Sequence, residues 1–383
     1  MLKLDFISKK EVIASDQQTK DILAKGYFGF MKDRLLYLES EEVLYLIDVR
    51  GATCSYNKKE LSFGKVAERF GLNGKLLARY LTYKDWRDRG LIIKKLDSIH
   101  GIGTKLPEKK YPLSELKLNI KPIEGLFFPY DLTTVIDEPI IGKELYEQYW
   151  LGQYGTYKLS DRGILNKLDI YETLFLLENN ILNIKGYNKS SIIELATKRR
   201  NDFIKLYQVY KDWRSKGYVI KTGFKFGTHF RLYFPGAKPI KNDDWVHSKH
   251  VIHVFPRDTK LLISEWARAI RVAHSVRKTF ILAIPGKSRK RSINIDFMLY
   301  HRKNNNIETP DTSKPKYAML SLSEEEKIGG AELSAIINEA KDKKLELIIA
   351  IADRETAITY YKVIKIELPK STYEYYEIDW MQP

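Results

Sequence analysis

The chain has 383 residues, in which 65 lysines and arginines outnumber 49 acidic residues and give a formal net charge of +16. This length exceeds a typical single domain of about 100–200 residues, so we expect at least two hydrophobic cores. The charge attracts polyanions and makes nucleic acid the leading class of partner, while no apolar run approaches the roughly 18 residues of a membrane span. With no signal-peptide pattern and a single cysteine, Cys54, we expect a soluble cytoplasmic protein without an intramolecular disulfide.

The first half of the chain contains two related segments. The string YKDWRDRG at Tyr83–Gly90 recurs 127 residues later as YKDWRSKG at Tyr210–Gly217, and each copy precedes an apolar run that ends in lysine. Upstream of each copy lie a Gly-Tyr segment, an apolar stretch and a charged span of mostly helical pattern. Because an eight-residue near-identity rarely arises by chance, the sequence predicts two N-terminal units of α+β type.

A weaker repeat follows, in which Glu265–Ile284 aligns with Glu332–Ile351 at an offset of 67 residues. Both copies show an amphipathic helical pattern followed by a β-prone run. A linker-like stretch at Lys303–Pro315, rich in Asn, Pro and Thr, separates them. We therefore predict an α+β protein with these segments: 1–110, a degenerate N-terminal unit; 111–240, a second N-terminal unit leading into the catalytic unit; 241–302, the catalytic C-terminal domain; 303–315, a linker; 316–383, a degenerate C-terminal unit. The role of the insert at 110–144 stays open.

Motif searches disfavour nucleotide-driven and zinc chemistry, because the chain lacks a P-loop, a dinucleotide fingerprint and HExxH. Histidines instead gather in one region, and only His100 lies outside it; they are His229, His247, His250, His253, His274 and His301. A metal site is one interpretation of this cluster. On a strand, however, His250 would face away from His247 and His253, which disfavours shared ligation.

Cutting RNA without a metal requires a base for the 2′-hydroxyl, an acid for the departing 5′-oxygen and a cation for the growing charge on phosphorus. Histidine suits the acid, because its usual pKa near 6.5 lets it change charge around neutrality, and lysine suits the cation. Tyrosine, with a usual pKa near 10, needs a neighbouring cation to serve as the base, or else it orients the hydroxyl.

Three runs carry these residue types: GYVIKTGFKFGTHFRLY at Gly217–Tyr233, HSKHVIHVFP at His247–Pro256 and RVAHSVRK at Arg271–Lys278. In sequence, order and spacing they resemble the archaeal tRNA-splicing endonucleases, closely over 210–284 and more weakly elsewhere. The resemblance implies a restriction-endonuclease-like mixed sheet in each C-terminal lobe. It also implies catalysis by Tyr233, His247 and Lys278, without metal or other cofactor. The expected reaction is cleavage of precursor tRNA at bulge-helix-bulge junctions, which leaves 2′,3′-cyclic phosphate and 5′-hydroxyl ends.

Each assignment has a structural alternative. Tyr233 ends an alternating strand pattern and would otherwise be a packed aromatic, and Lys278 follows a helix whose dipole it could complement. Without the resemblance, His250 and His253 compete equally with His247. Arg271 lies on the same predicted helix, where the family uses arginine to grip a bulged base; otherwise it is a solvated residue.

The remaining copies lack this residue set. In the 67-residue register, His247 aligns with Lys314 and Lys278 with Leu345, so we expect one active site per chain. The layout resembles the three-unit ε2-type members of the family, which implies a homodimer and a broader intron tolerance. The turn at 352–356 would supply an acidic docking loop through Asp353 and Glu355. A basic turn is expected to meet RNA phosphate; its residues are Lys287, Arg289, Lys290 and Arg291.

Two rival functions remain from the sequence. A non-catalytic RNA-binding scaffold is equally compatible with the charge and the 25 tyrosines, but the Tyr/His/Lys set argues against it. A metal-dependent DNA nuclease needs paired carboxylates near a lysine, and only Asp296 is found near Lys278 at a suitable place. The prediction is therefore an RNA endonuclease.

Overall fold

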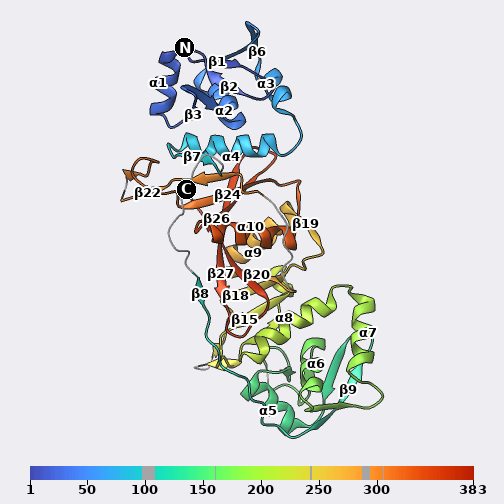
Figure 1. Cartoon of the computed structure of the whole chain (residues 1–383). Helices are drawn as coiled ribbons and strands as arrows, with labels where there is room; N and C mark the ends of the chain where they lie inside the picture. The colour runs from blue at the N-terminus through green and yellow to red at the C-terminus, as the bar shows by residue number, and fades with distance from the viewer. Residues whose placement is uncertain (97–107, 160, 242–243, 287–293, 305) are drawn as a thin grey trace.

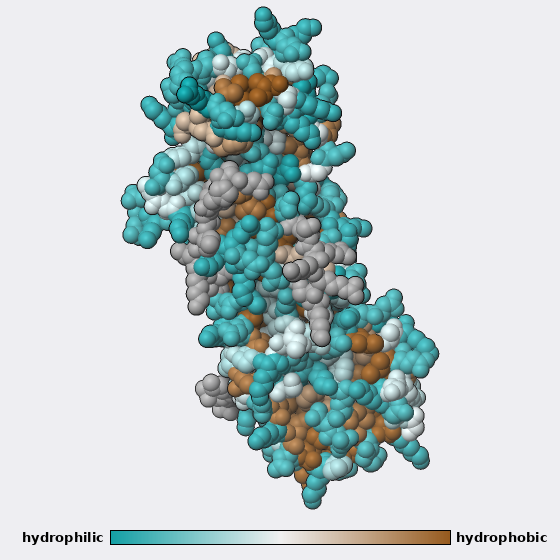
Figure 2. All heavy atoms as spheres, in the orientation of Figure 1, coloured by the Kyte–Doolittle hydropathy of each residue, from teal (hydrophilic) through white to brown (hydrophobic). Residues whose placement is uncertain are grey.

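A computed structural model describes residues 1–96, 108–159, 161–241, 244–286, 294–304 and 306–383. The molecule is elongated, with one lobe at each end and a large sheet between them (Figure 1). The face shown in Figure 2 is largely hydrophilic, with apolar areas on both end lobes. In the described part of the chain, no helix is long and apolar enough to cross a membrane.

The first lobe combines a six-stranded sheet with four helices, and its strands follow the order β3-β4-β2-β1-β5-β6. Its strands are β1 (Lys3–Phe6), β2 (Val12–Ala14), β3 (Phe30–Lys32), β4 (Leu35–Leu38), β5 (Thr53–Tyr56) and β6 (Lys59–Leu61). Its helices are α1 (Gln17–Lys25), α2 (Ser40–Arg50), α3 (Phe63–Phe70) and α4 (Leu76–Asp88).

The second lobe has a five-stranded sheet in the order β11-β12-β10-β9-β13. Its strands are β9 (Ile123–Phe128), β10 (Thr133–Ile136), β11 (Gln153–Tyr154), β12 (Asn166–Leu168) and β13 (Leu182–Ile184). Its helices are α5 (Pro139–Tyr149), α6 (Ile170–Glu178), α7 (Lys189–Arg199) and α8 (Phe203–Ser215). Local sequence fixes where these helices begin: Asp169 and Glu172 form a capping box at the start of α6.

The central sheet runs in the order β14-β15-β18-β20-β28-β27-β26-β24-β21-β7, and β8 (Lys109–Lys110) pairs with β27. The strands on the β14 side are β14 (Val219–Thr222), β15 (Phe230–Tyr233), β18 (His250–Val254), β20 (Thr279–Ile284) and β28 (Glu374–Met381). Those on the β7 side are β27 (Ile358–Glu367), β26 (Glu346–Ala352), β24 (Tyr317–Ser323), β21 (Phe297–Leu299) and β7 (Ile93–Lys95). We call these two sets the first and second halves of the sheet.

Each half contains a parallel strand pair joined by a helix. Helix α9 (Ile263–Ser275) connects β18 to β20, and α10 (Gly330–Asp342) connects β24 to β26. The two connections meet where β19 (Lys260–Leu262) pairs with β25 (Lys327–Gly329). Shorter pairs join β16 (Ile240–Lys241) to β17 (Asp244–Trp245) and β22 (Arg302–Lys303) to β23 (Asn306–Ile307).

Alternation along the strands divides the core between the two faces of the sheet. Phe280 and Leu282 of β20 pack with α9 and α10, whereas Ile281 and Ala283 pack with α8 and the second lobe. In the second half of the sheet, Ile348 of β26 packs toward α4 and the first lobe. Helices α9 and α10 therefore cover one face of the sheet, and the two lobes cover the other face.

Several strands pair across the segment boundaries expected from sequence, and β21 and β28 are two examples. Strand β21, expected in the catalytic segment, pairs with β24 and β7. Strand β28, expected in the last segment, pairs with β20 of the catalytic segment as well as with β27. Hydrogen bonding along strand edges decides these partners, and no local sequence pattern records it.

Candidate active site

Three neighbouring strands bring their ends together at one edge of the sheet. Strand β15 ends at Tyr233 and runs antiparallel to β18, so its last residue lies beside the start of β18. His247 precedes β18, and Lys278 precedes β20, which runs parallel to β18. The end of β15 and the beginnings of β18 and β20 therefore place Tyr233, His247 and Lys278 in one region.

Lys278 is held by neutral groups. Its side chain is 9% exposed, and Nζ donates to the backbone carbonyl of Ser248 and, at 3.0 Å, to Ser248 Oγ. The ammonium also lies 4.8 Å from the ring centroid of Phe226. No carboxylate in the described part of the chain forms an ion pair with Lys278. Burial and the nearby Arg231 charge lower the pKa of Lys278.

Tyr233 is buried beside the same serine. Only 5% of the residue is exposed, and its ring lies 4.5 Å from that of Trp150, measured between centroids. Burial raises the pKa of Tyr233, and two neighbours act in the opposite direction: the positive charge of Arg231 and a side-chain hydrogen bond with Ser248. The phenol is therefore protonated at neutral pH, and its conversion to the basic form depends on these neighbours.

His247 differs from the other histidines of its region because its side chain is exposed. His253 and His250 lie within β18, where burial lowers the pKa of each to about 4. Burial also lowers the pKa of His229, whose Nδ1 accepts a hydrogen bond from the Val254 amide at 2.9 Å. Of these four, His247 alone combines solvent access with a position beside Tyr233.

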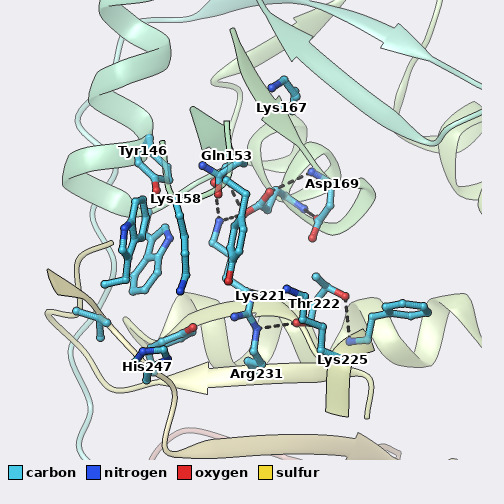
Figure 3. A pocket seen from close by; sticks show the side chains of 18 residues that line it. Tyr146, Gln153, Lys158, Lys167, Asp169, Lys221, Thr222, Lys225, Arg231 and His247 are labelled. Carbon is cyan, nitrogen blue, oxygen red and sulfur yellow. Dashed lines mark hydrogen bonds and ion pairs between the residues drawn. The ribbon is translucent and has the colours of Figure 1, made fainter. Parts of the chain in front are cut away.

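A cavity of about 490 Å³ separates the second lobe from the sheet edge (Figure 3). In Figure 3, Arg231 and His247 lie on the sheet side, while Tyr146, Gln153 and Lys167 lie on the lobe side. Tyr233 and His247 also border a second hollow of about 630 Å³. Lys158, Lys167 and Lys225 also line the first cavity, and with Arg231 they outnumber its acidic residues, Asp169 and Glu172, so the cavity favours an anionic occupant.

A buried ion pair fixes the second lobe against β14. Lys221 Nζ donates to Glu172 Oε1 at 2.6 Å and to the Gly152 carbonyl at 2.8 Å, and the Gly152 amide donates to the same carboxylate at 3.0 Å. Lys221 lies opposite Arg231 in the β14–β15 register. This contact therefore sets the distance between the lobe and the strand that carries Tyr233.

Of the other residues expected from sequence, those that the structure describes do not line the cavity at Tyr233. Arg271 is exposed on α9. Burial raises the pKa of Tyr361 of β27, and the positive charge of Arg271 acts in the opposite direction. Lys287, Arg289, Lys290 and Arg291 lie outside the described residues. Asp353 and Glu355 lie in the turn between β26 and β27. Asp353 lines a hollow that shares no residue with the cavity at Tyr233.

Two residues that sequence reasoning missed lie inside the site: Ser248 and Arg231. Arg231 Nε donates to the Thr222 carbonyl at 2.8 Å, and the residue lines the cavity. The sequence could have indicated Arg231, because residues two positions apart on a strand lie on the same face, and Arg231 is two positions before Tyr233. Among the described residues, no group of three or more His, Cys, Asp and Glu side chains is arranged to hold a metal ion.

Comparison of the sequence with known proteins places the chain in a family. Residues 203–295 match the sequence profile of the tRNA intron endonuclease, catalytic C-terminal domain. The tRNA-splicing endonuclease of Methanococcoides burtonii is 26% identical over 334 residues, which cover 73% of this chain and 94% of that protein. That of Methanopyrus kandleri is 35% identical over 144 residues, 36% of this chain and 75% of the relative. That of Thermococcus kodakarensis is 36% identical over 121 residues, 30% of this chain and 68% of the relative. The chain belongs to the tRNA-splicing endonuclease family.

Proposed function

We propose that this enzyme cuts precursor tRNA at the bulge-helix-bulge junctions of its introns, using Tyr233, His247 and Lys278 without a metal. The observation that carries the proposal is that Tyr233, His247 and Lys278 lie at the ends of three adjacent strands, where Lys278 lacks a carboxylate partner among the described residues. An unneutralised ammonium in a buried position is suited to a phosphate whose negative charge grows during reaction.

In the proposed reaction, Tyr233 takes the proton of the 2′-hydroxyl next to the scissile phosphate. The 2′-oxygen forms a bond to phosphorus, and the bond from phosphorus to the 5′-oxygen breaks. His247 donates a proton to the departing 5′-oxygen, and Lys278 stabilises the charge on the phosphate. The products are a 2′,3′-cyclic phosphate and a 5′-hydroxyl, and solvent restores the starting protonation of both side chains.

This proposal is tested with a labelled bulge-helix-bulge RNA in EDTA, followed by analysis of the product ends. We expect cyclic-phosphate and 5′-hydroxyl ends at both junctions. Cleavage only with added Mg²⁺ would favour a metal-dependent nuclease, and RNA binding without cleavage in either buffer would favour a scaffold.

We also propose that the chain contains two related units. Helices α4 and α8 begin and end 127 residues apart, and α9 and α10 begin and end 67 residues apart. The contact between Lys221 and Glu172 has a counterpart in the first lobe. There, Lys94 Nζ donates to the Gly29 carbonyl at 2.7 Å, and the Gly29 amide donates to Glu42 at 3.0 Å. The first lobe with the second sheet half would form one unit, and the second lobe with the first half the other.

A homodimer is the assembly that we propose. The substrate has two cut sites, whereas one chain carries one complete Tyr/His/Lys set. Internal contacts hold the acidic turn at 352–356. Asp353 Oδ1 accepts hydrogen bonds from the Glu355 and Ala357 amides at 2.9 Å. The one basic side chain of the turn, Arg354, forms ion pairs with Glu324 and Glu325. Because this turn and the basic cavity border separate hollows, we propose that the turn enters the cavity of a second copy.

Charge reversal tests the assembly. We expect the double variant Asp353→Lys with Glu355→Lys to sediment as a monomer under conditions in which the wild type sediments as a dimer. The exposed pair Lys65→Glu with Glu68→Lys serves as the matched control and should remain dimeric. An acidic-turn variant that stays dimeric would rule out this docking mode.

A further inference from the structure

Ser248 connects the proposed base to the proposed cation. The residue is 5% exposed and lies between His247 and the start of β18. Its Oγ accepts a hydrogen bond from Lys278 Nζ at 3.0 Å, and its backbone carbonyl accepts a second from the same ammonium. A side-chain interaction with Ser248 also lowers the pKa of Tyr233, in opposition to the larger effect of burial. One small buried residue therefore contacts both side chains.

The direction of these hydrogen bonds follows from the donor inventory. A lysine ammonium can only donate, so Ser248 Oγ must accept from Lys278. A serine hydroxyl has one hydrogen of its own, which is then free to point at Tyr233. A hydrogen bond donated to a tyrosine oxygen favours the phenolate over the phenol, which is the form that a base requires. The chain of donors runs from Lys278 through Ser248 to Tyr233.

The second half of the sheet supports this assignment, given the proposed repeat. At the 67-residue offset, Tyr233 corresponds to Tyr300, whereas Ser248 corresponds to Pro315 and Lys278 to Leu345. Burial raises the pKa of Tyr300 to about 12. A buried tyrosine is therefore present in both halves, and the hydroxyl and ammonium beside it are present in one.

We propose that Ser248 is a positioning residue: it accepts a hydrogen bond from Lys278 and donates its own hydrogen to Tyr233. This donation stabilises the phenolate and so allows Tyr233 to act as a base. This inference rests on the proposed function. Without Ser248, the buried phenol would lose its donor and the ammonium would lose one of its acceptors. The phenolate would become rarer, while contacts between the enzyme and the rest of the RNA would persist.

The pH profile provides a readout that a purely structural role would not change. When the pKa of the base is higher than the pKa of the acid, the cleavage rate is constant, and so forms a plateau, at pH values between the two. In this range, a rise in pH increases the fraction of phenolate and decreases the fraction of imidazolium by the same factor. Raising the pKa of Tyr233 lowers this plateau and moves its alkaline end upward, and the acidic end stays in place. Arg231 and Tyr157 act on Tyr233 electrostatically, and Tyr233 acts in turn on Tyr146. The other charged or titratable residues that line the same cavity are Lys158, Lys167, Asp169, Glu172, Lys221, Lys225 and His247.

The experiment compares Ser248→Ala, Ser248→Thr and the control Ser275→Ala. The Ser275 hydroxyl donates to the Val272 carbonyl on the exposed face of α9. Single-turnover cleavage is measured with saturating enzyme in EDTA across pH, together with RNA binding and urea unfolding. For Ser248→Ala we expect a plateau about 10- to 100-fold lower, from the loss of one hydrogen bond to a charged group. RNA binding should stay within about threefold, and Ser248→Thr and Ser275→Ala should both cleave near the wild-type rate.

A double-mutant cycle completes the test. In a Tyr233→Phe background, Ser248→Ala should cause little further loss, because the two residues act through one bond. A Ser248→Ala enzyme that cleaves within about threefold of wild type, or that loses rate with both pH limbs unmoved, overturns the inference. A wild-type enzyme that leaves no cyclic phosphate in EDTA overturns the proposed function instead, so the two failures are distinguishable.

Discussion

The two halves of the central sheet carry nearly the same tetrapeptide in corresponding strands. Strand β15 and its end read Phe230-Arg231-Leu232-Tyr233, and β21 with the next residue reads Phe297-Met298-Leu299-Tyr300. In each, the Phe and Leu side chains pack toward a lobe. Arg231 lines the cavity, whereas Met298 is buried in the core beneath α9 and α10.

This difference separates what the fold needs from what the chemistry needs. Phe and Leu fill a core in both halves, so packing alone is enough to retain them. Arg231, His247, Ser248 and Lys278 surround only one of the two tyrosines. A tyrosine at this strand end is thus compatible with a purely structural role, and the polar residues around it distinguish the site.

Replacing each tyrosine by phenylalanine gives the sharpest test of this distinction. We expect Tyr233→Phe to lower single-turnover cleavage by about 10³-fold, because the site is buried and water cannot easily replace the base. Tyr300→Phe should leave the rate unchanged, since the corresponding positions lack the catalytic pair: Lys314 stands in place of His247, and Leu345 in place of Lys278. Equal losses in both variants, measured at saturating enzyme, would show that the tyrosines act through folding.

The variant Lys278→Leu introduces leucine, the residue found at the corresponding position of the second half, Leu345. We expect cleavage to fall by about 10²- to 10³-fold, because a single cationic stabiliser of the reacting phosphate is removed. Far-UV circular dichroism should be unchanged, since leucine tolerates this buried position in the other half. Lys278→Arg, which keeps the charge, should recover part of the rate; an arginine variant as slow as the leucine variant would argue against a purely electrostatic role.

His247→Ala should lower cleavage less, by about 10²-fold, because water reaches this exposed position and can protonate the leaving oxygen slowly. Added imidazole should restore part of the activity. The matched variant in the second half is Lys314→Ala, also exposed, which should cleave at the wild-type rate. Loss of RNA binding in His247→Ala equal to its loss of rate would contradict the role as an acid.

The smallest effect concerns stability. Burial lowers the pKa of His253 to about 4. The folded state therefore favours the neutral ring. The contribution of His253 to the free energy of unfolding is complete above the pKa of histidine in the unfolded chain, near 6.5, and is lost as the pH falls toward 4. Between pH 7 and pH 5, we expect His253 to lower the free energy of unfolding by about 2 kcal/mol. Urea unfolding at both pH values should show a smaller decrease in the free energy of unfolding for His253→Gln than for the wild type.

Local patterns predicted the elements around the site better than their partners. The periodicity of Trp266, Ala269, Ile270 and Ala273 predicts a helix, and α9 spans Ile263–Ser275. The offset of 67 residues relates β18, α9 and β20 to elements of the second half. Membership of the tRNA-splicing endonuclease family, expected from the runs around Tyr233 and Lys278, is confirmed.

The residues that were missed are those whose role depends on contacts between distant segments. Ser248 is an ordinary polar residue in the sequence, and only the parallel pairing of β18 with β20 brings it to Lys278. Arg231 on an alternating strand resembles a solvated residue until the second lobe covers it. The roles of Tyr233, His247 and Lys278, the segment boundaries and the acidic turn stay predictions.

Strand β28 has a consequence for how the protein is made. It lies between β20 and β27, yet Glu374 is synthesised about ninety residues after Ile284, the last residue of β20. At a ribosomal rate of about 5–20 residues per second, the edge of β20 waits roughly 5–20 s for its partner. An uncovered strand edge is a template for pairing with other chains. The yield of active enzyme should therefore depend on translation speed and on chaperones that shield β20 during synthesis.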